Sequence, residues 1–206
     1  YLKKYLPRNS IITIFNPLFY ENKIISNKLR KNLLTVGRLE NQKNISGIIL
    51  ALKKVKIYFP DIKLLIIGSG SKKKILEQLV KENKLNNNVE FKGYINPQNY
   101  LLSSKILILN SFFEGMPNIL QEALANKIPI ISTNCESGPS EILENGKYGT
   151  LTEVNNHNLL AEKIINIMNN YDDAQKKAED GYKSLHRFNS DNQLKKIENY
   201  LYSFNN

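Results

Sequence analysis

Two carboxylates eight residues apart, Glu114 and Glu122, are the acidic side chains whose spacing could serve a ligand. Pro117 lies between them and suits the first turn of a helix, because its missing N–H is not needed there. Helix geometry would put both acids on roughly one side, about 12 Å apart along the axis. The acid pair of a glycoside hydrolase is only about 5–9.5 Å apart. The spacing therefore favours two carboxylates that bind different hydroxyl groups of an elongated ligand. The alternative is that both are solvated charges on a helix surface.

A second candidate site follows an apolar run that reads as the first strand. Gly37 ends this run, and Arg38 and Lys43 follow just before a helical segment. The backbone amides and the dipole of a helix N-terminus attract an anion, and nearby cations add to that attraction. Cations are otherwise unfavourable beside a helix N-terminus, so they indicate an anionic partner unless they are simply solvated.

A glycine-rich turn, Gly68-Ser69-Gly70-Ser71, follows the second apolar run. It is half of the dinucleotide-binding fingerprint of oxidoreductases, because the third glycine would fall at Lys73. It therefore predicts either a phosphate cradle or a plain tight turn. Acids for hydroxyl groups and cations for phosphates together suit a nucleotide-sugar, in which a diphosphate joins a ribose to a hexose.

Six short apolar runs alternate with helical segments along the chain. The runs are continuous, which is typical of parallel strands covered on both faces, and they lie at 33–36, 62–67, 89–91, 106–109, 128–132 and 149–152. Apolar periodicity predicts helices at 45–58, 72–84, 118–125, 140–143, 159–169, 172–186 and 190–204. This order predicts an α/β fold with a doubly wound, mostly parallel, Rossmann-like sheet and extra C-terminal helices. Such a sheet binds its ligand at the carboxyl ends of its strands, where the candidate segments lie.

The chain divides into three predicted parts. Residues 1–32 do not fit the strand–helix repeat and read as a segment that enters from a missing upstream domain. Residues 33–170 form the nucleotide-sugar-binding sheet domain, and 171–206 form C-terminal helices. The chain opens at Tyr1 without a signal-peptide pattern, which indicates a piece of a longer protein. The single cysteine, Cys135, fits a reducing compartment, and no apolar run is long enough to span a bilayer.

The charge is concentrated in the first half of the chain. The 206 residues hold 29 basic and 19 acidic side chains, a formal net charge of +10. Residues 1–84 hold 18 of the basic and 5 of the acidic ones, which either favours an anionic partner or reflects a lysine-rich composition. A basic nucleic-acid-binding module is an alternative, although its motifs and interleaved aromatic residues are not recognisable. Basic residues at Lys3, Lys4 and Arg8 would suit an anionic membrane surface.

Together these segments resemble the carboxyl-terminal, donor-binding domain of GT-B glycosyltransferases, specifically the family-4 (group 1) retaining enzymes. The resemblance covers roughly residues 12–204, with motifs in the family's order: Asn16-Pro17, Gly37-Arg38 with Lys43, Gly68-Ser69-Gly70, Phe91-Lys92-Gly93, Glu114 with Glu122, 137–141 and 146–149. The pair of glutamates with seven residues between them is the family's hallmark. Asn44 departs from the family, which often has glycine there, and 137–141 is one of several family variants. These departures leave the base and the sugar open.

The resemblance implies a role for each candidate residue. Arg38 and Lys43 would neutralise the donor diphosphate. Glu114 would hold hexose hydroxyls, and Glu122 would take the ribose hydroxyls. Arg38, Lys43 and Glu114 are accordingly the predicted catalytic residues. The other predicted donor-binding residues, of which those at 93–95 would meet the base, are Gly37, Gly68, Gly70, Gly93, Tyr94, Ile95, Gly115, Met116, Asn118 and Leu120.

The implied reaction is hexosyl transfer from a nucleotide-diphosphate sugar with retention at the anomeric carbon. UDP is the expected nucleotide, and no metal or other cofactor is expected, because two cations would stabilise the departing diphosphate. A missing amino-terminal domain, towards which 171–206 return, would bind a saccharide or lipid-linked acceptor, so this chain alone would bind donor but transfer little. The expected product is a bacterial surface polysaccharide or glycolipid, made in the cytoplasm, with peripheral contact to the inner face of the membrane left open. No nucleic-acid partner is expected, and a nucleotide-binding relative without transferase activity is the alternative.

Overall fold

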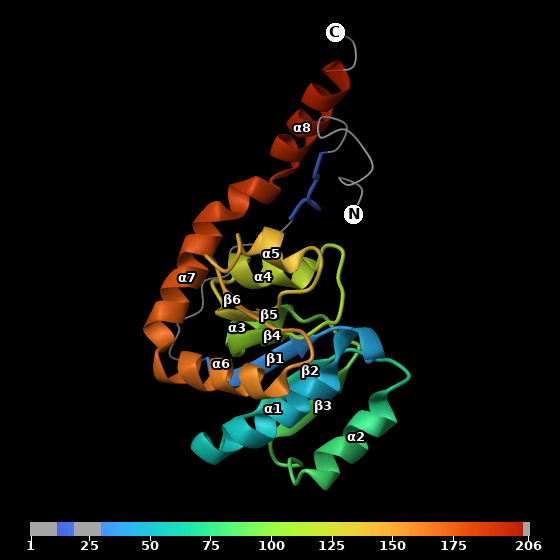
Figure 1. Ribbon diagram of the computed structural model, residues 1–206, viewed down its shortest axis with the longest axis vertical. Coiled ribbons are helices and arrows are strands. Elements are labelled where there is room, and N and C mark those ends of the chain that lie inside the picture. The colour runs from blue at the N-terminus through green and yellow to red at the C-terminus, as the bar shows by residue number, and fades with distance from the viewer. Residues whose placement is uncertain (1–11, 19–29, 204–206) are drawn as a thin grey trace.

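The computed structural model describes residues 12–18 and 30–203, which fold around one six-stranded sheet (Figure 1). The strands pair in parallel in the order β3-β2-β1-β4-β5-β6. Their bounds are β1 (Asn32–Val36), β2 (Leu64–Ile67), β3 (Val89–Gly93), β4 (Ser104–Leu109), β5 (Ile130–Thr133) and β6 (Thr150–Thr152). The predicted α/β fold with a parallel sheet is confirmed.

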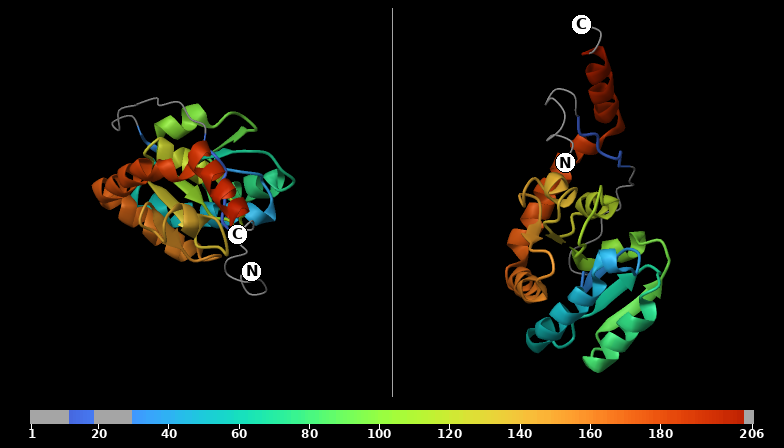
Figure 2. Two further views of the ribbon diagram at one scale, coloured as in Figure 1. Left: turned by 90° about the horizontal axis from the view of Figure 1, so that it is seen from above. Right: turned by 45° about the vertical axis from the view of Figure 1, so that its right-hand side comes forward.

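Helices cover both faces of this sheet, as the two views in Figure 2 show. One face carries α1 (Ile45–Tyr58), α2 (Lys73–Glu82) and α6 (His157–Asn169), and the other carries α3 (Gln98–Ser103), α4 (Asn118–Ala125) and α5 (Pro139–Ile142). Two apolar clusters result, and β2 contributes to both. Leu64 and Ile66 enter one cluster, whereas Leu65 and Ile67 enter the other. Successive side chains of a strand point to opposite faces, so a strand covered on both faces must be apolar at every position.

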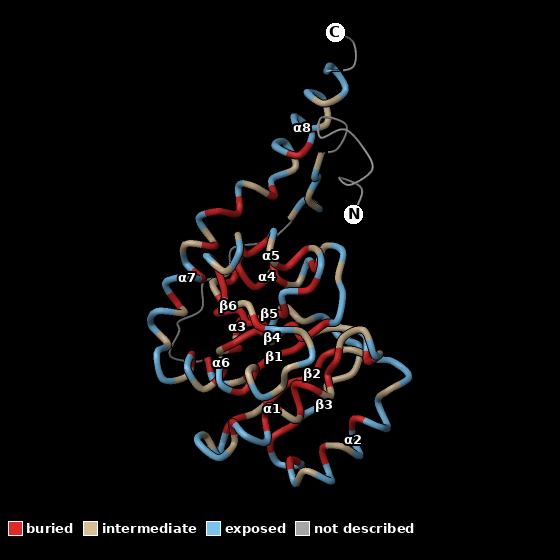
Figure 3. The backbone as a smooth tube through the Cα atoms, in the orientation of Figure 1, coloured by how far each residue is buried: buried red, intermediate tan, exposed pale blue. Residues whose placement is uncertain are grey.

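The burial pattern of α1 explains why this helix forms where the periodicity predicts it. Its apolar stripe faces the sheet, and the outward lysines remain exposed (Figure 3). Five apolar residues that recur at steps of three and four form this stripe, and all are buried: Ile45, Ile48, Ile49, Leu52 and Val55. The helix is therefore held by packing of one face, as its spacing of three and four residues predicts.

Two of the differences from the predicted elements have a clear local cause. The short helix α3 was not expected, because six residues with two buried leucines, Leu101 and Leu102, are too few to show a helical period. The predicted strand at 62–67 begins only at Leu64. Ile62 instead donates its N–H to Phe59 O at 3.1 Å and forms a turn before the strand.

The C-terminal helices pack against the sheet domain. The predicted helix at 172–186 is α7 (Tyr171–Lys183), followed by the 3₁₀ turn η5 (Ser184–Phe188) and by α8 (Ser190–Tyr202). A Cβ on Gly181 of α7 would lie only 2.5 Å from Leu124 Cδ2 of α4, so these helices touch closely. Phe188 is fully buried in the same cluster as α4. Only α8 extends away, and its Leu194 and Leu201 are 56% and 58% exposed.

Segment 12–18 lies beside the start of α8, although the two are far apart in the sequence (Figure 1). The ring of Phe15 meets the ring of Phe188 edge to face at 5.1 Å between centroids. The N–H of Phe15 donates to Gln193 Oε1 at 2.8 Å, and the N–H of Leu18 donates to Phe188 O at 3.1 Å. Most of the predicted leading segment 1–32 lies outside the described residues, so its connection to another domain stays a prediction.

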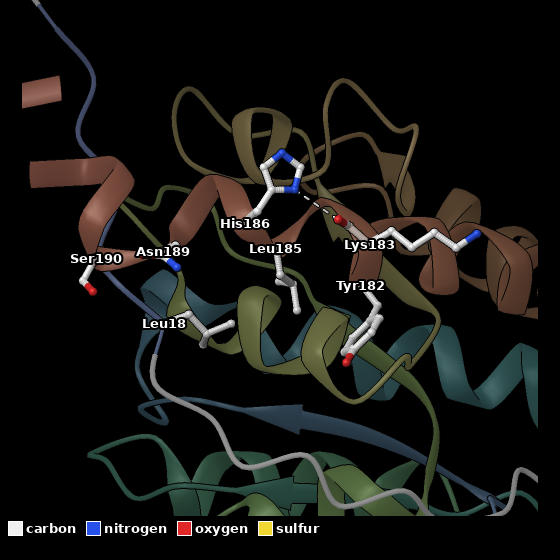
Figure 4. A pocket seen from close by; sticks show the side chains of 7 residues that line it. All are labelled: Leu18, Tyr182, Lys183, Leu185, His186, Asn189 and Ser190. Carbon is white, nitrogen blue, oxygen red and sulfur yellow. Dashed lines mark hydrogen bonds between the residues drawn. The ribbon is translucent and has the colours of Figure 1, made fainter. Parts of the chain in front are cut away.

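A pocket of about 340 Å³ opens between this segment and the C-terminal elements (Figure 4). Its lining residues are Leu18, Tyr182, Lys183, Leu185, His186, Asn189 and Ser190. The His186 Nδ1 atom lies 3.1 Å from Lys183 O. None of the predicted site residues lines this pocket. Across 12–18 and 30–203, no helix has both the length and the apolar content that a membrane crossing needs.

Candidate functional site

The strand order creates one topological switch point, between β1 and β4. The chain moves outward from β1 to β2 and β3 on one side, and from β4 to β5 and β6 on the other. Loops that leave β1 and β4 therefore diverge at the carboxyl edge and leave a crevice there, which is where such sheets bind ligands. The loop 37–44 follows β1 and the segment 110–117 follows β4. Both loops carry predicted site residues.

An ion pair joins these two loops across the switch point. Lys43 Nζ donates to Glu114 Oε1 at 2.5 Å, and both side chains are largely buried. The same carboxylate oxygen accepts a hydrogen bond from Ser111 Oγ, also at 2.5 Å. The structure thus places two predicted catalytic residues in direct contact, 71 positions apart in the sequence. Glu114 is held in one orientation by two donors.

Arg38 lies on the same loop but has a different environment. Its side chain is exposed, and Nη2 donates to Gln42 Oε1 at 3.1 Å. Gln42 also contacts the β4 loop: its Nε2 donates to Phe113 O at 2.9 Å, and its carbonyl accepts from the N–H of Phe112 at 2.8 Å. Within 12–18 and 30–203, Arg38 has no carboxylate partner. Its charge is therefore available to an anion.

Asn44 completes the β1 loop in a conformation that glycine would also allow. Its φ of 43° and ψ of 46° are left-handed, a region that asparagine tolerates better than most residues. Its Oδ1 accepts from the N–H of Gly47 at 3.3 Å and caps α1. Asn110 Nδ2 donates to the carbonyl of Asn44 at 3.0 Å, so the end of β4 supports the cap. The departure from the family's glycine thus leaves the local backbone intact.

The glycine turn after β2 serves packing between loops. Gly68 has a φ of +142°, and a Cβ there would lie 1.9 Å from Gly37 O. A Cβ on Gly70 would lie 2.5 Å from the carbonyl oxygen of Leu39. The N–H of Leu39 donates to Ser69 O at 2.8 Å, which joins the β1 and β2 loops. Glycine is needed here because another backbone takes the space of a side chain.

A carboxylate of the chain itself occupies the predicted phosphate cradle. Glu40 Oε1 accepts from the N–H of Ser71 at 2.7 Å, and Oε2 accepts from Ser71 Oγ at 2.8 Å. These bonds lower the pKa of Glu40, first through the backbone N–H and then through the hydroxyl. The N–H of Lys72 is also used, since it donates to Leu39 O at 3.0 Å. The interpretation of 68–71 as an open cradle is therefore wrong for these donors.

Glu122 differs from Glu114 in having no partner. It lies in the middle of α4 and is half-buried. Its backbone carbonyl accepts from Asn126 Nδ2 at 2.8 Å, but its carboxylate has no hydrogen bond or ion pair with the residues that the structure describes. Burial raises the pKa of Glu122, because the charged form loses water without gaining a donor. An unpartnered, desolvated carboxylate at this position is suited to accept hydroxyl groups from a ligand.

The helical spacing that was used for the two acids does not hold. The helix α4 begins at Asn118, and Pro117 before it has an extended backbone with ψ of 92°. Glu114 therefore precedes the helix by four residues and lies in a non-helical loop. Proline disfavours helical backbone in the residue before it, which explains why the helix does not extend back to Glu114. The expected separation of about 12 Å along a helix axis therefore does not apply to Glu114 and Glu122.

The β5 loop supports the backbone around Glu114. Ser137 Oγ donates to Glu114 O at 2.6 Å. Gly138 has a φ of +88°, and a Cβ there would lie 2.4 Å from Gly115 O, so the two loops are in close contact. Gly115 itself faces open space, with nothing within 4 Å of a Cβ built on it. The predicted segment 137–141 thus holds the β4 loop from behind.

Three predicted residues at the start of α4 have different surroundings. Asn118 is exposed, and its Oδ1 accepts from Asn16 Nδ2 at 2.9 Å, which links segment 12–18 to the site. Met116 is partly buried against the apolar cluster. Leu120 is fully buried, and its N–H donates to Pro117 O at 3.0 Å. These surroundings give no support to the predicted role of Leu120 in donor binding, which stays a prediction.

The loop after β3 lies at the same edge of the sheet. The carbonyl of Gly93 accepts from the N–H of Gly68 at 2.8 Å, so the ends of β2 and β3 adjoin. Gly93 has a φ of +75°, and Tyr94 is 88% exposed. Ile95 is 39% exposed. These residues are free of core packing, as contact with a base would require.

Within the described part of the chain, no group of three or more His, Cys, Asp or Glu side chains could hold a metal ion. His157 begins α6 and His186 lies in η5, both away from the switch point in the fold. Cys135 is buried behind the β5 loop. Burial, and next the charge of Glu114, raise the pKa of its thiol. Cys135 therefore lies close enough to the β4 loop to respond to the charge of Glu114.

Three contact residues had no role in the sequence prediction. Gln42 and Glu40 lie inside the 37–43 loop, and no spacing rule distinguishes them from other exposed polar residues. Ser111 precedes Glu114 by three residues, a separation at which a turn brings side chains together. Of these three residues, only Ser111 could have been predicted from the sequence to contact Glu114.

The chain matches the family model described as "Glycosyl transferases group 1" over residues 19–184. It is 34% identical over 149 residues to the N-acetylgalactosamine-N,N'-diacetylbacillosaminyl-diphospho-undecaprenol 4-alpha-N-acetylgalactosaminyltransferase of Campylobacter jejuni, which covers 72% of this chain and 40% of that protein. It is 30% identical over 171 residues to the poly(glycerol-phosphate) alpha-glucosyltransferase of Bacillus subtilis, which covers 82% of this chain and 25% of that protein. The chain thus spans less than half the length of these relatives.

Solved structures show the same fold. Staphylococcus aureus TarM, as a mutant in complex with fondaparinux, alpha-GlcNAc-glycerol and UDP, matches with a TM-score of 0.87 and 27% identity. This match covers 97% of the present chain and 41% of the TarM chain. Anabaena HepE in complex with UDP and glucose matches with a TM-score of 0.76 and 20% identity, over 84% of this chain and 49% of that one. At that identity the likeness shows the fold alone.

Proposed function

Because this chain belongs to the group 1 glycosyltransferase family, we propose that it is the donor-binding half of a retaining hexosyltransferase that uses a nucleotide-diphosphate sugar. One observation carries this proposal: the β1 and β4 loops bring Arg38, Lys43 and Glu114 together at the switch point of the sheet. Two cations and an oriented carboxylate at that edge suit a sugar diphosphate.

The roles follow from the surroundings of each side chain. Arg38 has a free guanidinium face and suits a bidentate contact with the diphosphate, whereas Lys43 supplies a point charge. Glu114, oriented by Lys43 and Ser111, would accept hexose hydroxyls. Glu122 would accept the ribose hydroxyls, which would give its half-buried carboxylate the donors that it lacks.

The reaction breaks the bond between the anomeric carbon and the departing diphosphate. Negative charge grows on the leaving oxygen, and cations that are already in place stabilise it without reorganising. Lys43 is held against Glu114 and is therefore positioned before the donor arrives. We propose that these two cations do the neutralising without a metal. Retention fits the alpha-linked products in the relatives' names, since an alpha-linked donor then gives an alpha-linked product.

UDP is the nucleotide we propose, because the TarM structure, whose chain is 27% identical to this one, contains it. The relatives' names include a diphospho-undecaprenol acceptor and a poly(glycerol-phosphate) acceptor. We propose a saccharide or lipid-linked acceptor of a surface polymer, bound by a second domain on the cytoplasmic side, with peripheral membrane contact. The relatives are more than twice as long as the matched region, so we expect this chain to bind donor and transfer little alone.

Ligand-observed NMR with UDP, GDP and ADP, and then with their sugars, tests the proposal. UDP binding should fall at least about tenfold in Arg38→Ala and in Glu122→Ala, a loss of about 1.4 kcal/mol. Lys73→Ala is the matched control, because this lysine lies on α2 with Glu77 as its partner. Absence of any nucleotide binding by the unaltered chain would overturn the proposal.

The same measurement separates the two glutamates. Glu114→Ala should weaken binding of the UDP-sugar more than binding of UDP, because only the sugar contacts this carboxylate in the proposal. Equal losses for both ligands would remove the assignment of Glu114 to the hexose. The alternative is that this chain is a nucleotide-binding relative without transferase activity. In that case UDP and UDP-sugar should have the same affinity in the unaltered chain and in every variant.

A further inference from the structure

Gln42 lies between the free cation and the loop that carries the acid. Its amide oxygen faces Arg38, and its amide nitrogen faces the carbonyl of Phe113. Its own carbonyl accepts from the N–H of Phe112, so the backbone at this position is fixed to the β4 loop. A single side chain thus connects the guanidinium of Arg38 to the far side of the switch point.

Chemistry at both ends determines which way this amide points. A guanidinium can only donate hydrogen bonds, and a backbone carbonyl can only accept them. The amide oxygen must therefore face Arg38 and the amide nitrogen must face Phe113 O. A carboxylate could satisfy Arg38 but would place an oxygen against the Phe113 carbonyl. Glutamine supplies an acceptor at one end and a donor at the other.

The acids near Arg38 are engaged elsewhere. Glu40, two residues away, has both carboxylate oxygens on Ser71. Glu114 has Oε1 on Lys43 and Ser111. Of the two cations, Lys43 is therefore already paired with an acid, whereas Arg38 is held by a neutral group. The guanidinium is therefore oriented without an ion pair, and the charge of Glu40 acts on it only through space.

We propose that Gln42 is a positioning residue that orients Arg38 towards the donor diphosphate without neutralising it. This inference rests on the proposed function, because it assigns the ligand of Arg38 to a diphosphate. It assigns to Gln42 a role in affinity for the phosphates and none for the nucleoside.

Two substitutions separate orientation from charge. Gln42→Ala removes the contact with Arg38 and should lower UDP affinity about threefold, because an exposed hydrogen bond to a charged group contributes little. Gln42→Glu has nearly the same shape but puts a negative charge beside Arg38 and the diphosphate. It should lower UDP affinity about tenfold, and the loss should shrink as salt is added.

Uridine is the control ligand, because a substitution that simply damaged the structure would weaken uridine binding as well as UDP binding. Its affinity should be the same in the unaltered chain, Gln42→Ala and Gln42→Glu, because it has no phosphates. Gln78→Glu is the matched control: it adds the same charge on α2, where Gln78 is exposed and bonded to Glu82. It should leave UDP affinity unchanged.

The outcomes distinguish the inference from the proposed function. UDP affinity in the order unaltered, Gln42→Ala, Gln42→Glu, with constant uridine affinity, supports the positioning role. Tighter UDP binding by Gln42→Glu than by Gln42→Ala would overturn it, since a hydrogen-bond acceptor alone would then suffice. Equal losses of UDP and uridine would also overturn it. Failure of the unaltered chain to bind UDP would instead remove the proposed function.

Discussion

The carboxyl edge of the sheet has two sides that look alike in sequence and differ in structure. On the β1–β2 side, the loops 37–44 and 68–71 close on each other, with Gly68 against Gly37 and Glu40 on Ser71. On the β4 side, the segment 110–122 leaves groups unused, with Gly115 in open space and Glu122 without a partner in the described chain.

The difference teaches what a glycine in a loop motif is for. Gly68 and Gly70 are required because neighbouring backbone fills the place of a side chain. Gly115 has no such neighbour, so its small size matters only if something else approaches. A packed glycine serves the fold, whereas a glycine in open space is a candidate for contact with a ligand.

The largest expected effect is on stability at Gly68. Gly68→Ala places a Cβ 1.9 Å from Gly37 O at a φ of +142°, and should lower the free energy of unfolding by about 3 kcal/mol or more. Gly115→Ala should change it by less than about 0.5 kcal/mol, because the added methyl meets nothing. Urea denaturation measures both. Similar losses in the two variants would contradict the comparison.

A bulkier change at Gly115 tests the β4 side for ligand contact. Gly115→Val should weaken binding of a UDP-sugar about tenfold, or about 1.4 kcal/mol, while UDP affinity and Tm stay unchanged. The reason is that a hexose held by Glu114 would lie against this backbone. Titration calorimetry with UDP and with UDP-sugar compares the two affinities. If UDP-sugar still binds at full strength, the hexose lies elsewhere.

A smaller loss of stability is expected when the contact between Glu40 and Ser71, which joins the β1 and β2 loops, is removed. Glu40→Gln and Ser71→Ala should each lower Tm by a fraction of the Gly68→Ala loss, because the bond lies at the surface. The double variant should lose less than the sum of the two single losses, since both substitutions act on the hydrogen bond between Ser71 Oγ and Glu40 Oε2. Thermal melts of the three variants check this. Additive losses would mean that the two residues act separately.

The smallest effect is a pair of opposite pH dependences. The lowered pKa of Glu40 means that its contribution is present above the ordinary value of 4.5 and is lost as pH falls through the lowered pKa. The raised pKa of Glu122 means that stability falls as pH rises from 4.5 through the raised value.

Urea midpoints measured across this pH range would show both slopes. Glu122→Gln should abolish the fall above pH 4.5. Glu40→Gln should reduce the loss on the acid side without removing it, because the pKa values of Glu90, Glu144 and Asp180 are lowered too. If the slope above pH 4.5 is the same in Glu122→Gln as in the unaltered chain, the Glu122 carboxylate is solvated. Its desolvation would then no longer support a role in binding ribose hydroxyls.

The fold was predictable because its signals are local. Continuous apolar strands and the stripe on α1 depend on the period of one element, and both are confirmed. The helix α3 was missed because six residues are too few to show a period. The prediction that Glu114 and Glu122 share one helix was wrong, because Pro117 has extended backbone and the helix starts after it.

The site was predictable only in part. Arg38, Lys43 and Glu114 were expected to share a ligand, and the last two are in direct contact. Leu120 was named for its closeness to the motif in sequence, which does not distinguish a buried from an exposed position of one helix turn, and the structure buries it. Some contacts depend on how the loops of different strands meet, which a local sequence pattern does not show. Examples are the contacts of Glu40 with Ser71 and of Gln42 with Phe113.

From the position of β1 between β2 and β4 we expect an order of assembly. The β1-β2-β3 part joins neighbours in sequence, whereas Lys43 and Glu114 are 71 residues apart and close a much longer loop. Their crevice is therefore absent from any chain that has organised only its first three strands. A nucleotide that grips both loops would have nothing to hold until late in folding. We expect UDP to retard unfolding while leaving the refolding rate unchanged.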